Sequence, residues 1–597
     1  MTATLAPSGS SVALDWRRAL LWGGICALSL VSVSLIGLPV GMNKRILIEP
    51  VLSLGYLFLL WIPLVFGYVA TTVVVLEGVE ARKSGTADLL AGLTAGLMGG
   101  IGLTLLMVGL DTVNIRKPLV NWSPQLFRLL TFERGLEFGI PVWLGICAGL
   151  GLVGAVLHQL PAVARRVMSW VVFGVMAIAI LEAVIDDLAE GFHLEWLTDA
   201  MYYKKGGTEG LTVTSAVVLA LVLAALPVVT GGRVKAVVGR FRDAPSEDRR
   251  RTSLVLFGAI GLACVGLPMI LGGIVNELLA NVGLFLLLAL GLNIVVGLAG
   301  LLDLGYVAFF AVGGYTTSVL TSSNSPFFAP EWHFGIALLF VVVMAATAGL
   351  VIGAPVIRMR GDYLAIVTLG FGEIVRLLFL SDWLKPYFGG SQGITKVNPV
   401  ELGPFKVQGS DPRSVFYLVL VFCALAIYVS WRLQGSRLGR AWMATREDEQ
   451  VAEAMGINTV NAKLMAFVVG ATMAAFSGAV LAAKVGSVFP KSFEILVSII
   501  ILVVVIVGGM GNIAGVMVGS LVLIGILGGP RQPGLLQEFQ SYKLLIYGAL
   551  LVFMMLKRPE GLVPSARRSR ELHQDEYLQD AWLGDDAESE EDQGAPS

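Results

Sequence analysis

The chain has 597 residues, of which 56% are hydrophobic and only 14% are charged, and its mean hydropathy is +0.80. This composition excludes a soluble globular domain and indicates a membrane protein. The formal net charge of −1 argues against a nucleic-acid partner. The four cysteines lie far apart within apolar runs, so we expect neither a disulfide framework nor a metal site.

The N-terminal part is predicted to form a membrane domain of its own. Residues 1–17 are expected to be a disordered cytosolic N-terminus. The apolar run that follows is too long for a signal peptide and lacks a small-residue cleavage site, so we expect a retained first span. Residues 18–230 would then form an extra membrane domain of about six spans, whose role the sequence does not show. Its five further candidate spans lie at 50–75, 88–110, 137–158, 168–187 and 211–230.

A change in composition marks the next boundary. Residues 231–251 are basic, with Asp-Ala-Pro-Ser near their centre, and we expect a cytosolic linker. Residues 252–563 follow as a second membrane domain of about ten spans. Residues 564–597 are rich in acids and are expected to be a disordered cytosolic tail. The ten candidate spans lie at 252–272, 279–298, 304–321, 335–355, 362–380, 414–431, 464–483, 493–509, 513–528 and 541–556.

The predicted fold class is therefore an all-α, polytopic integral membrane protein of about sixteen spans, some of them short or re-entrant. An even number of spans places both termini on one side. The loops on that side hold the larger share of Lys and Arg, so both termini and residues 438–458 are expected to be cytoplasmic.

Residues 438–458 form the longest polar interruption in the C-terminal half. Apolar side chains recur in this stretch at roughly helical spacing, and Gly456 is expected to end the helix. An amphipathic helix between two spans has to dock on something outside the membrane; a solvated connecting loop is the alternative. A charged cluster, expected to be exposed, consists of Arg446, Glu447, Asp448 and Glu449.

Two further stretches carry polar groups at or near membrane depth. Residues 287–315 contain Asn293 and Asp303 among glycines that allow close helix packing or helix breaks. Glu373 and Arg376 lie three positions apart and can pair on one helical face. A charge near the bilayer centre costs about 2.5–3.5 kcal/mol, which a partner has to offset. A structural ion pair and a role in transport both stay open.

Several motifs resemble the permease subunits of branched-chain amino acid ABC importers. The most specific is Arg-Gly-Asp-Tyr at 360–363 followed by Thr-Leu-Gly-Phe-Gly-Glu-Ile-Val-Arg at 368–376. Residues 287–315 are similar to the family's opening signature. Further matching segments are Gly-Gly-Ser-Gln-Gly-Ile at 389–394, Gly-Gly-Met-Gly-Asn at 508–512 and Lys-Arg-Pro-Glu-Gly-Leu at 557–562. The resemblance thus covers residues 252–563, whereas residues 1–251 do not resemble the partner permease.

The resemblance implies that residues 438–458 are the loop that slots into a groove on a cytosolic ATPase. Only Glu453, Ala454 and Gly456 match the general importer consensus, and the loop otherwise follows the version of the branched-chain subfamily. The expected coupling residues are Gly439, Arg440, Arg446, Glu453, Ala454 and Gly456.

The family also implies a set of partners and a substrate path. The partners are a second permease subunit, two cytosolic ABC ATPases and an extracytoplasmic substrate-binding protein, besides membrane lipid. No P-loop occurs in the chain, so ATP is expected on the partner subunits, and we expect no catalytic residue, metal or cofactor in this chain. The candidate path residues are Asn293, Asp303, Tyr306, Thr368, Glu373 and Gln392, and the expected helix-packing glycines are Gly511, Gly515 and Gly519.

The predicted function is ATP-driven import of branched-chain, hydrophobic amino acids across the plasma (inner) membrane of a prokaryote. Related amino acids, amides or urea are alternative substrates. An ion-coupled secondary carrier or a membrane subunit of a redox complex would need buried acids in several helices, and this chain offers few. A sensory membrane protein with residues 1–251 as its sensor is a third alternative. Whether the chain pairs with itself or with a different permease is not decided by the sequence.

Overall fold

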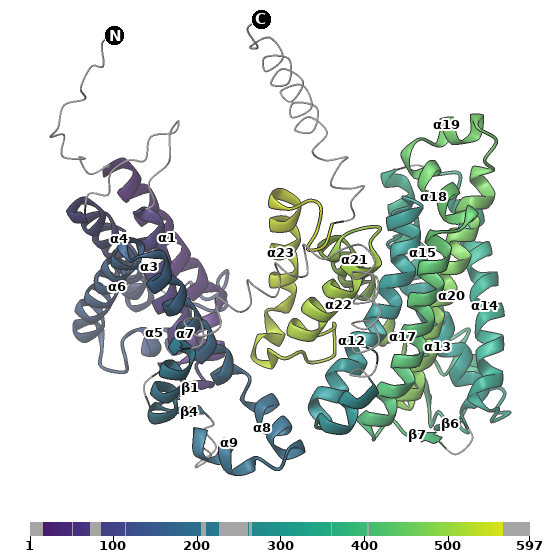
Figure 1. Ribbon diagram of the computed structural model, residues 1–597, viewed down its shortest axis with the longest axis horizontal. Coiled ribbons are helices and arrows are strands. Elements are labelled where there is room, and N and C mark those ends of the chain that lie inside the picture. Colours follow the sequence, from purple (N-terminus) through teal and green to yellow (C-terminus); the bar gives the residue numbers. More distant parts are fainter. Residues whose placement is uncertain are drawn as a thin grey trace, which may run out of the picture. The chain divides into compact units, whose positions relative to one another are not determined.

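In the computed structural model the chain divides into two compact units (Figure 1). Unit 1 comprises residues 1–189 and 193–256, and unit 2 comprises residues 190–192 and 257–597. The structure describes residues 16–50, 52–71, 85–113, 115–203, 210–225, 261, 265–359, 361–402 and 405–564. The expected linker, most of the expected tails and most of the candidate span 252–272 lie outside these described residues.

Unit 1 is built on four long apolar helices that pack on one another. Small residues bring them close: a Cβ at Gly96 would meet the carbonyl group of Cys147, so α4 and α6 touch along their backbones. Trp143 of α6 is fully buried and donates from Nε1 to the Leu130 carbonyl oxygen over 2.8 Å. The helices of the unit are α1 (Trp16–Ile36), α2 (Leu38–Met42), α3 (Leu54–Ala70), α4 (Gly85–Thr112), α5 (Pro124–Leu130), α6 (Leu136–Gln159), α7 (Ala162–Ile180), α8 (Glu182–Gly191) and α9 (Glu195–Met201), followed by the apolar helix Val213–Ala225.

A small sheet and a buried ion pair tie the ends of these helices together. The sheet has the order β2-β1-β4-β3, with β1 parallel to β4. Arg45 lies just before β1 and donates to the carboxylate of Glu182, the first residue of α8, over 2.8 Å. Because the Glu182 side chain is only 4% exposed, this partner offsets the cost of burying its charge. The strands are β1 (Ile46–Glu49), β2 (Leu52–Ser53), β3 (Tyr202–Tyr203) and β4 (Gly210–Thr212).

Unit 2 is wrapped around one central helix, α12 (Gly273–Leu292). In the most apolar 18-residue stretch of this span, 94% of the residues are buried, against 22% in the corresponding stretch of α14. Every residue of α12 from Ala280 to Leu292 is buried, and Ser477 donates to the Leu284 carbonyl oxygen over 2.9 Å. Its last turn widens into the π-helix η1 (Asn293–Leu298), a feature that often occurs at functional sites. The helices that pack against α12 are α17 (Pro412–Gln434), α20 (Thr459–Val485), α21 (Ile495–Gly508) and α22 (Ile513–Leu527).

Unit 2 has two opposite ends, which are named here after the elements that lie there. The helices α18 (Arg437–Glu447) and α19 (Glu449–Ala454) lie at one end, here called the α18 end, and the hairpin β6–β7 (Val400–Leu402 and Phe405–Val407) lies at the other, the hairpin end (Figure 1). The pair β5 (Ile394–Thr395) and β8 (Ser487–Val488) joins the loops of the hairpin end. The other helices are α13 (Val307–Thr321), α14 (Phe334–Val356), α15 (Asp362–Leu380), α16 (Lys385–Phe388), η2 (Gly390–Gln392), η3 (Pro490–Phe493), η4 (Gln537–Ser541) and α23 (Lys543–Lys557).

The all-α, polytopic fold class is confirmed. Among the described residues, ten helices are long and apolar enough to cross a membrane, and four more apolar helices are shorter. The predicted total of sixteen spans is not confirmed. With 15 residues, α22 is shorter than the roughly 20 residues of a full crossing, and α21 reaches 19 residues only together with η3.

Candidate functional site

The α18 end is anchored by one tryptophan. Ser436 caps α18, its Oγ accepting from the Gly439 N–H over 3.2 Å. Trp442, fully buried, donates from Nε1 to the Ala462 carbonyl oxygen of α20 over 2.7 Å. Gly439 is buried at a close approach, where a Cβ would meet the carbonyl oxygens of Leu433 and Gln434. The Trp442 hydrogen bond and the close approach at Gly439 therefore hold α18 against the membrane-spanning part of unit 2.

Residues 438–458 form two helices, whereas one helix was predicted. Asp448 leaves the helical conformation (φ −150°, ψ 112°), and its carboxylate accepts from the backbone N–H groups of Gln450 and Val451. This is a helix N-cap, so the chain starts a new helix instead of continuing the old one. The expected stop at Gly456 is confirmed, since its φ of +86° is a left-handed conformation that glycine adopts without strain.

The α19 tip presents a mixed apolar and polar surface. Met455 is 79% exposed, and Val451 is exposed beside it. Of the expected coupling residues, Arg440, Glu453, Ala454 and Gly456 are exposed, whereas Gly439 is buried and Arg446 is half-buried.

The expected charged cluster is only partly exposed, which corrects the sequence-based prediction. Glu447 and Asp448 are exposed. Arg446 turns inward and donates to the carbonyl oxygen of Gly297 in η1. Glu449 forms an ion pair with Lys463, a residue of α20 that is only 6% exposed. The partners Gly297 and Lys463 lie outside this run of charged residues, so the run itself gave no sign of either contact.

Further hydrogen bonds join the π-helical turn to two other elements. The N–H of Gly511, in the turn between α21 and α22, donates to Asn293 Oδ1 over 2.8 Å. Gln434 Nε2, at the end of α17, donates to the Gly511 carbonyl oxygen over 3.3 Å. Together with the Arg446–Gly297 bond, these contacts connect α18, η1, α17 and the α21–α22 turn at one level of the molecule. We call this set of contacts the η1 link.

Asp303 and Tyr306 lie in the buried connection between η1 and α13, and Thr368 of α15 contacts this connection. Asp303 Oδ1 accepts from the Gly305 N–H over 2.9 Å, and Thr368 Oγ1 accepts from the Leu304 N–H over 3.1 Å. Tyr306 donates to the Gly470 carbonyl oxygen over 2.8 Å. Like Asn293, these three side chains are at most 3% exposed and hold backbone turns in place. Their role as path residues stays a prediction.

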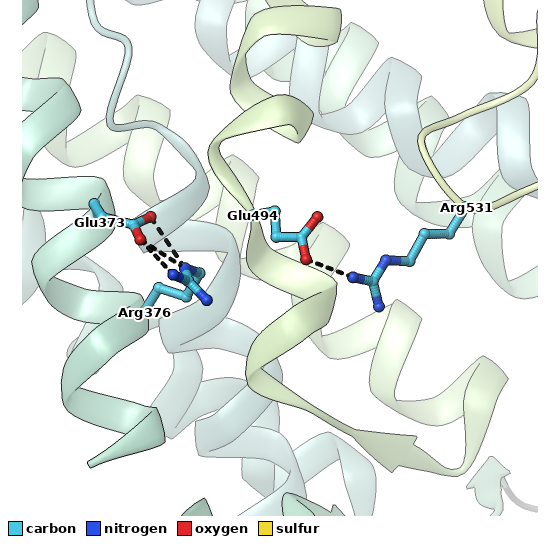
Figure 2. A network of polar contacts seen from close by, with 4 residues as sticks. All are labelled: Glu373, Arg376, Glu494 and Arg531. Carbon is cyan, nitrogen blue, oxygen red and sulfur yellow. Dashed lines mark hydrogen bonds and ion pairs between the residues drawn. The ribbon is translucent and has the colours of Figure 1, made fainter. Parts of the chain in front are cut away.

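Glu373 and Gln392 lie apart from this buried group. The Glu373 carboxylate accepts hydrogen bonds from Nε and Nη2 of Arg376, which confirms the expected pairing three positions apart (Figure 2). Gln392 is exposed in η2 at the hairpin end. The six candidate path residues therefore fall into a buried set of four near the η1 link and two separate, more exposed positions.

The three glycines expected to pack helices have different surroundings. A Cβ at Gly519 would lie 2.7 Å from the Val504 carbonyl oxygen, and one at Gly515 would lie 2.5 Å from that of Gly508. These contacts bring α21 and α22 backbone to backbone. Gly511 has a φ of +79° and belongs to the turn between the helices.

Sequence reasoning missed several polar groups of unit 2. Lys484 binds Asn281 and forms an ion pair with Glu277 over 3.8 Å, and Arg531 pairs with Glu494 over 2.7 Å. A basic residue at the end of an apolar run was a usable signal for Lys484. Among the residues that the structure describes, no three His, Cys, Asp or Glu side chains gather to hold a metal ion.

Comparison with known proteins places unit 2 among transport permeases. Residues 274–555 match the family model described as the permease component of the branched-chain amino acid transport system. The high-affinity branched-chain amino acid transport system permease protein LivM of Escherichia coli K12 is 39% identical over 310 residues, which cover 48% of this chain and 70% of the relative. The LivH permease protein of the same strain is 26% identical over 291 residues, or 47% of this chain and 91% of the relative.

The likeness extends to an archaeal relative. The probable branched-chain amino acid transport permease protein LivM of Methanocaldococcus jannaschii is 26% identical over 300 residues, covering 46% of this chain and 84% of the relative. No solved structure matches the chain.

Proposed function

Because this chain belongs to the family of branched-chain amino acid transport permeases and is a permease subunit, we propose that it imports leucine, isoleucine and valine by ATP-driven alternating access. The partners in this proposal are a second permease, two cytosolic ATPases and an extracytoplasmic binding protein. The relatives LivM and LivH carry different names within systems of the same description, which supports a second, different permease. The α18 end then faces the cytosol, and the hairpin end faces outward.

The surface of α19 carries this proposal. Met455 and Val451 are exposed although they lie outside the apolar spans, and exposed apolar groups of this kind mark protein contacts. The ion pair of Glu449 and Lys463 anchors α19 to α20, and Trp442 anchors the preceding α18 to α20, so a force applied at the tip reaches α20. A solvated connecting loop would need neither the anchors nor the exposed apolar tip.

The η1 link offers a route from the ATPase contact to the interior. Arg446 is the last-turn residue of α18 and binds a carbonyl oxygen of the π-helical turn. Gly297 and Gly300 line this contact, and a Cβ at Gly300 would lie 2.7 Å from the Arg446 side chain. A movement of α18 would therefore pull on the widened turn at the end of α12, and a shift of a packed helix of this kind can couple distant sites.

ATP-dependent uptake of radiolabelled leucine in proteoliposomes tests the proposed function. The vesicles hold this chain with the second permease and the ATPases, and the binding protein is added outside. We expect uptake to require ATP and to be abolished by Met455→Asp or Arg440→Glu, both at exposed positions whose change leaves the fold intact. Lys406→Glu, which reverses an exposed charge at the hairpin end, is the control.

Two outcomes would contradict parts of the proposal. Uptake that ignores ATP and follows a proton gradient would identify an ion-coupled secondary carrier and leave α18–α19 as a connector. ATP hydrolysis stimulated only by the binding protein of another amino acid, an amide or urea would keep the mechanism and reject the substrate.

A further inference from the structure

An apolar cavity that opens to the surface lies at the hairpin end of unit 2. Its volume is about 200 Å³, and its inner wall is apolar. The volume corresponds to several water molecules at about 30 Å³ each, which is room for one small molecule. The wall combines residues from α12, α13, α20 and α21, namely Leu284, Phe285, Leu288, Phe310, Leu481 and Val497.

The mouth of this cavity carries opposite charges side by side. Glu494, the N-cap of α21, accepts from Arg531 over 2.7 Å, and both side chains line the cavity. They are 44% and 47% exposed, so either charge can exchange its partner for a ligand at little cost. Figure 2 shows the pair of Glu373 and Arg376 next to them, and Arg376 interacts electrostatically with Glu494.

An unsatisfied acceptor lines the same cavity. Oε1 of Gln532 is buried and has no hydrogen-bond donor among the described residues. A buried acceptor without a donor costs free energy, which a ligand with an N–H group would recover. Lys491 also lines the cavity, so the site offers a carboxylate, a carboxamide oxygen and two cationic side chains beside an apolar chamber.

We propose that this cavity is a transient binding site for an α-amino acid zwitterion with a branched apolar side chain. The proposal rests on the proposed import function and gives it a location within this chain. The ammonium group would bind Glu494 and Gln532 Oε1, the carboxylate would bind Arg531, and the side chain would enter the apolar chamber. Since an α-amino acid carries its ammonium and carboxylate groups on the same carbon atom, it can bridge an ion pair as close as this one.

The chemistry of the site excludes two simpler ligand classes. A purely apolar ligand would leave the Gln532 oxygen unsatisfied and gain nothing from the charged mouth. A small polar amide or urea would leave the chamber unfilled, and the hydrophobic gain would be lost. The site therefore selects a ligand that has both the charged groups of an amino acid and an apolar side chain.

Protection of an engineered cysteine tests the proposal on the full chain in lipid nanodiscs, without the ATPases. Ser492 lines the cavity, and the described native cysteines Cys26, Cys147 and Cys423 are buried. In a Ser492→Cys, Cys264→Ser background we expect leucine to slow the modification of residue 492 by a charged thiol reagent. Leucinamide lacks the carboxylate, 4-methylpentanoate lacks the ammonium group and glycine lacks the side chain, so each should protect less.

Two substitutions connect each charge of the ligand to its partner. Glu494→Gln should weaken protection by leucine about tenfold and remove its advantage over 4-methylpentanoate, because the ammonium group loses its counter-charge. Arg531→Gln should weaken protection by leucine to a similar extent and remove its advantage over leucinamide, because the carboxylate loses its counter-charge. Glu401→Gln is the matched control, since Glu401 forms a similarly exposed pair with Lys406 over 2.9 Å at the same end but does not line the cavity.

The outcomes separate this proposal from the proposed function. Equal protection by all four compounds, none by leucine, or an effect of Glu401→Gln equal to that of Glu494→Gln would overturn the binding site, even in a chain that supports ATP-driven leucine uptake. Protection that follows the expected pattern, in a chain without such uptake, would keep the site and contradict the import function alone.

Discussion

At the α18 end of unit 2, the polar contacts are half-buried or buried and run mostly from a side chain to the backbone of a different element. At the hairpin end, the polar contact at the mouth of the cavity is the ion pair of Arg531 and Glu494, two side chains that are close to half exposed. A hydrogen bond to a buried carbonyl fixes a position, whereas an exposed ion pair exchanges easily with water or a ligand. This contrast supports the two proposals, in which the α18 end transmits movement and the hairpin end accepts a ligand.

The largest effect on the α18 end should come from Trp442→Ala. The side chain is fully buried and its Nε1 has a partner in α20, so truncation leaves a cavity and an unpaired carbonyl. We expect a loss of about 3–5 kcal/mol in the free energy of unfolding. Chemical unfolding of the purified chain measures this loss. The control is Trp431→Ala, which removes a side chain that is 63% exposed and should cost far less; equal losses would mean that Trp442 is no anchor.

A smaller loss of stability is expected from a substitution at the contact between α21 and α22. Gly519→Leu places side-chain atoms against the Val504 carbonyl oxygen, and overpacking of this kind costs about 1–3 kcal/mol. The thermal midpoint of the chain in detergent should fall accordingly. Gly548→Leu in α23, where a Cβ would meet nothing within 4 Å, serves as the control and should leave the midpoint unchanged. A midpoint that Gly519→Leu does not lower would contradict the close packing of these helices.

The smallest effect should come from Glu373→Gln. The Glu373 and Arg376 side chains are 38% and 20% exposed, and solvent-accessible pairs contribute about 0.2–1 kcal/mol. Unfolding in low and high salt should show a small loss that salt reduces further. A loss as large as that of Trp442→Ala would show that this pair holds the helices together, and the contrast between the two ends would fail.

Hydrophobic runs allowed much of unit 2 to be predicted. The span predicted at 362–380 has the same bounds as α15, because an Arg-Gly-Asp segment begins it and polar residues follow it. The two helices within 438–458 were missed, although Asp448 followed by Glu and Gln is a capping pattern. Apolar residues recur at helical spacing on both sides of that cap, so a single continuous helix was predicted.

The contacts that define the candidate site could not be predicted from local sequence. Arg446 and Gly297 are 149 residues apart, and Asn293 and Gly511 are 218 apart. An arginine in a run of charged residues gives no local sign that it turns inward. The family resemblance located the loop, but only the packing of α18 on η1 shows which of its side chains face the interior.

The ratio of leucine transported to ATP hydrolysed in the Arg446→Ala complex tests the central claim most directly. Because Arg446 joins α18 to the π-helical turn, we expect this ratio to fall about tenfold while ATP hydrolysis continues, and Arg446→Lys, which keeps one donor, to restore part of it. Arg437→Ala, at an exposed position of the same helix, should leave the ratio unchanged. An unchanged ratio in Arg446→Ala, or a loss of ATP hydrolysis together with transport, would contradict transmission through the η1 link.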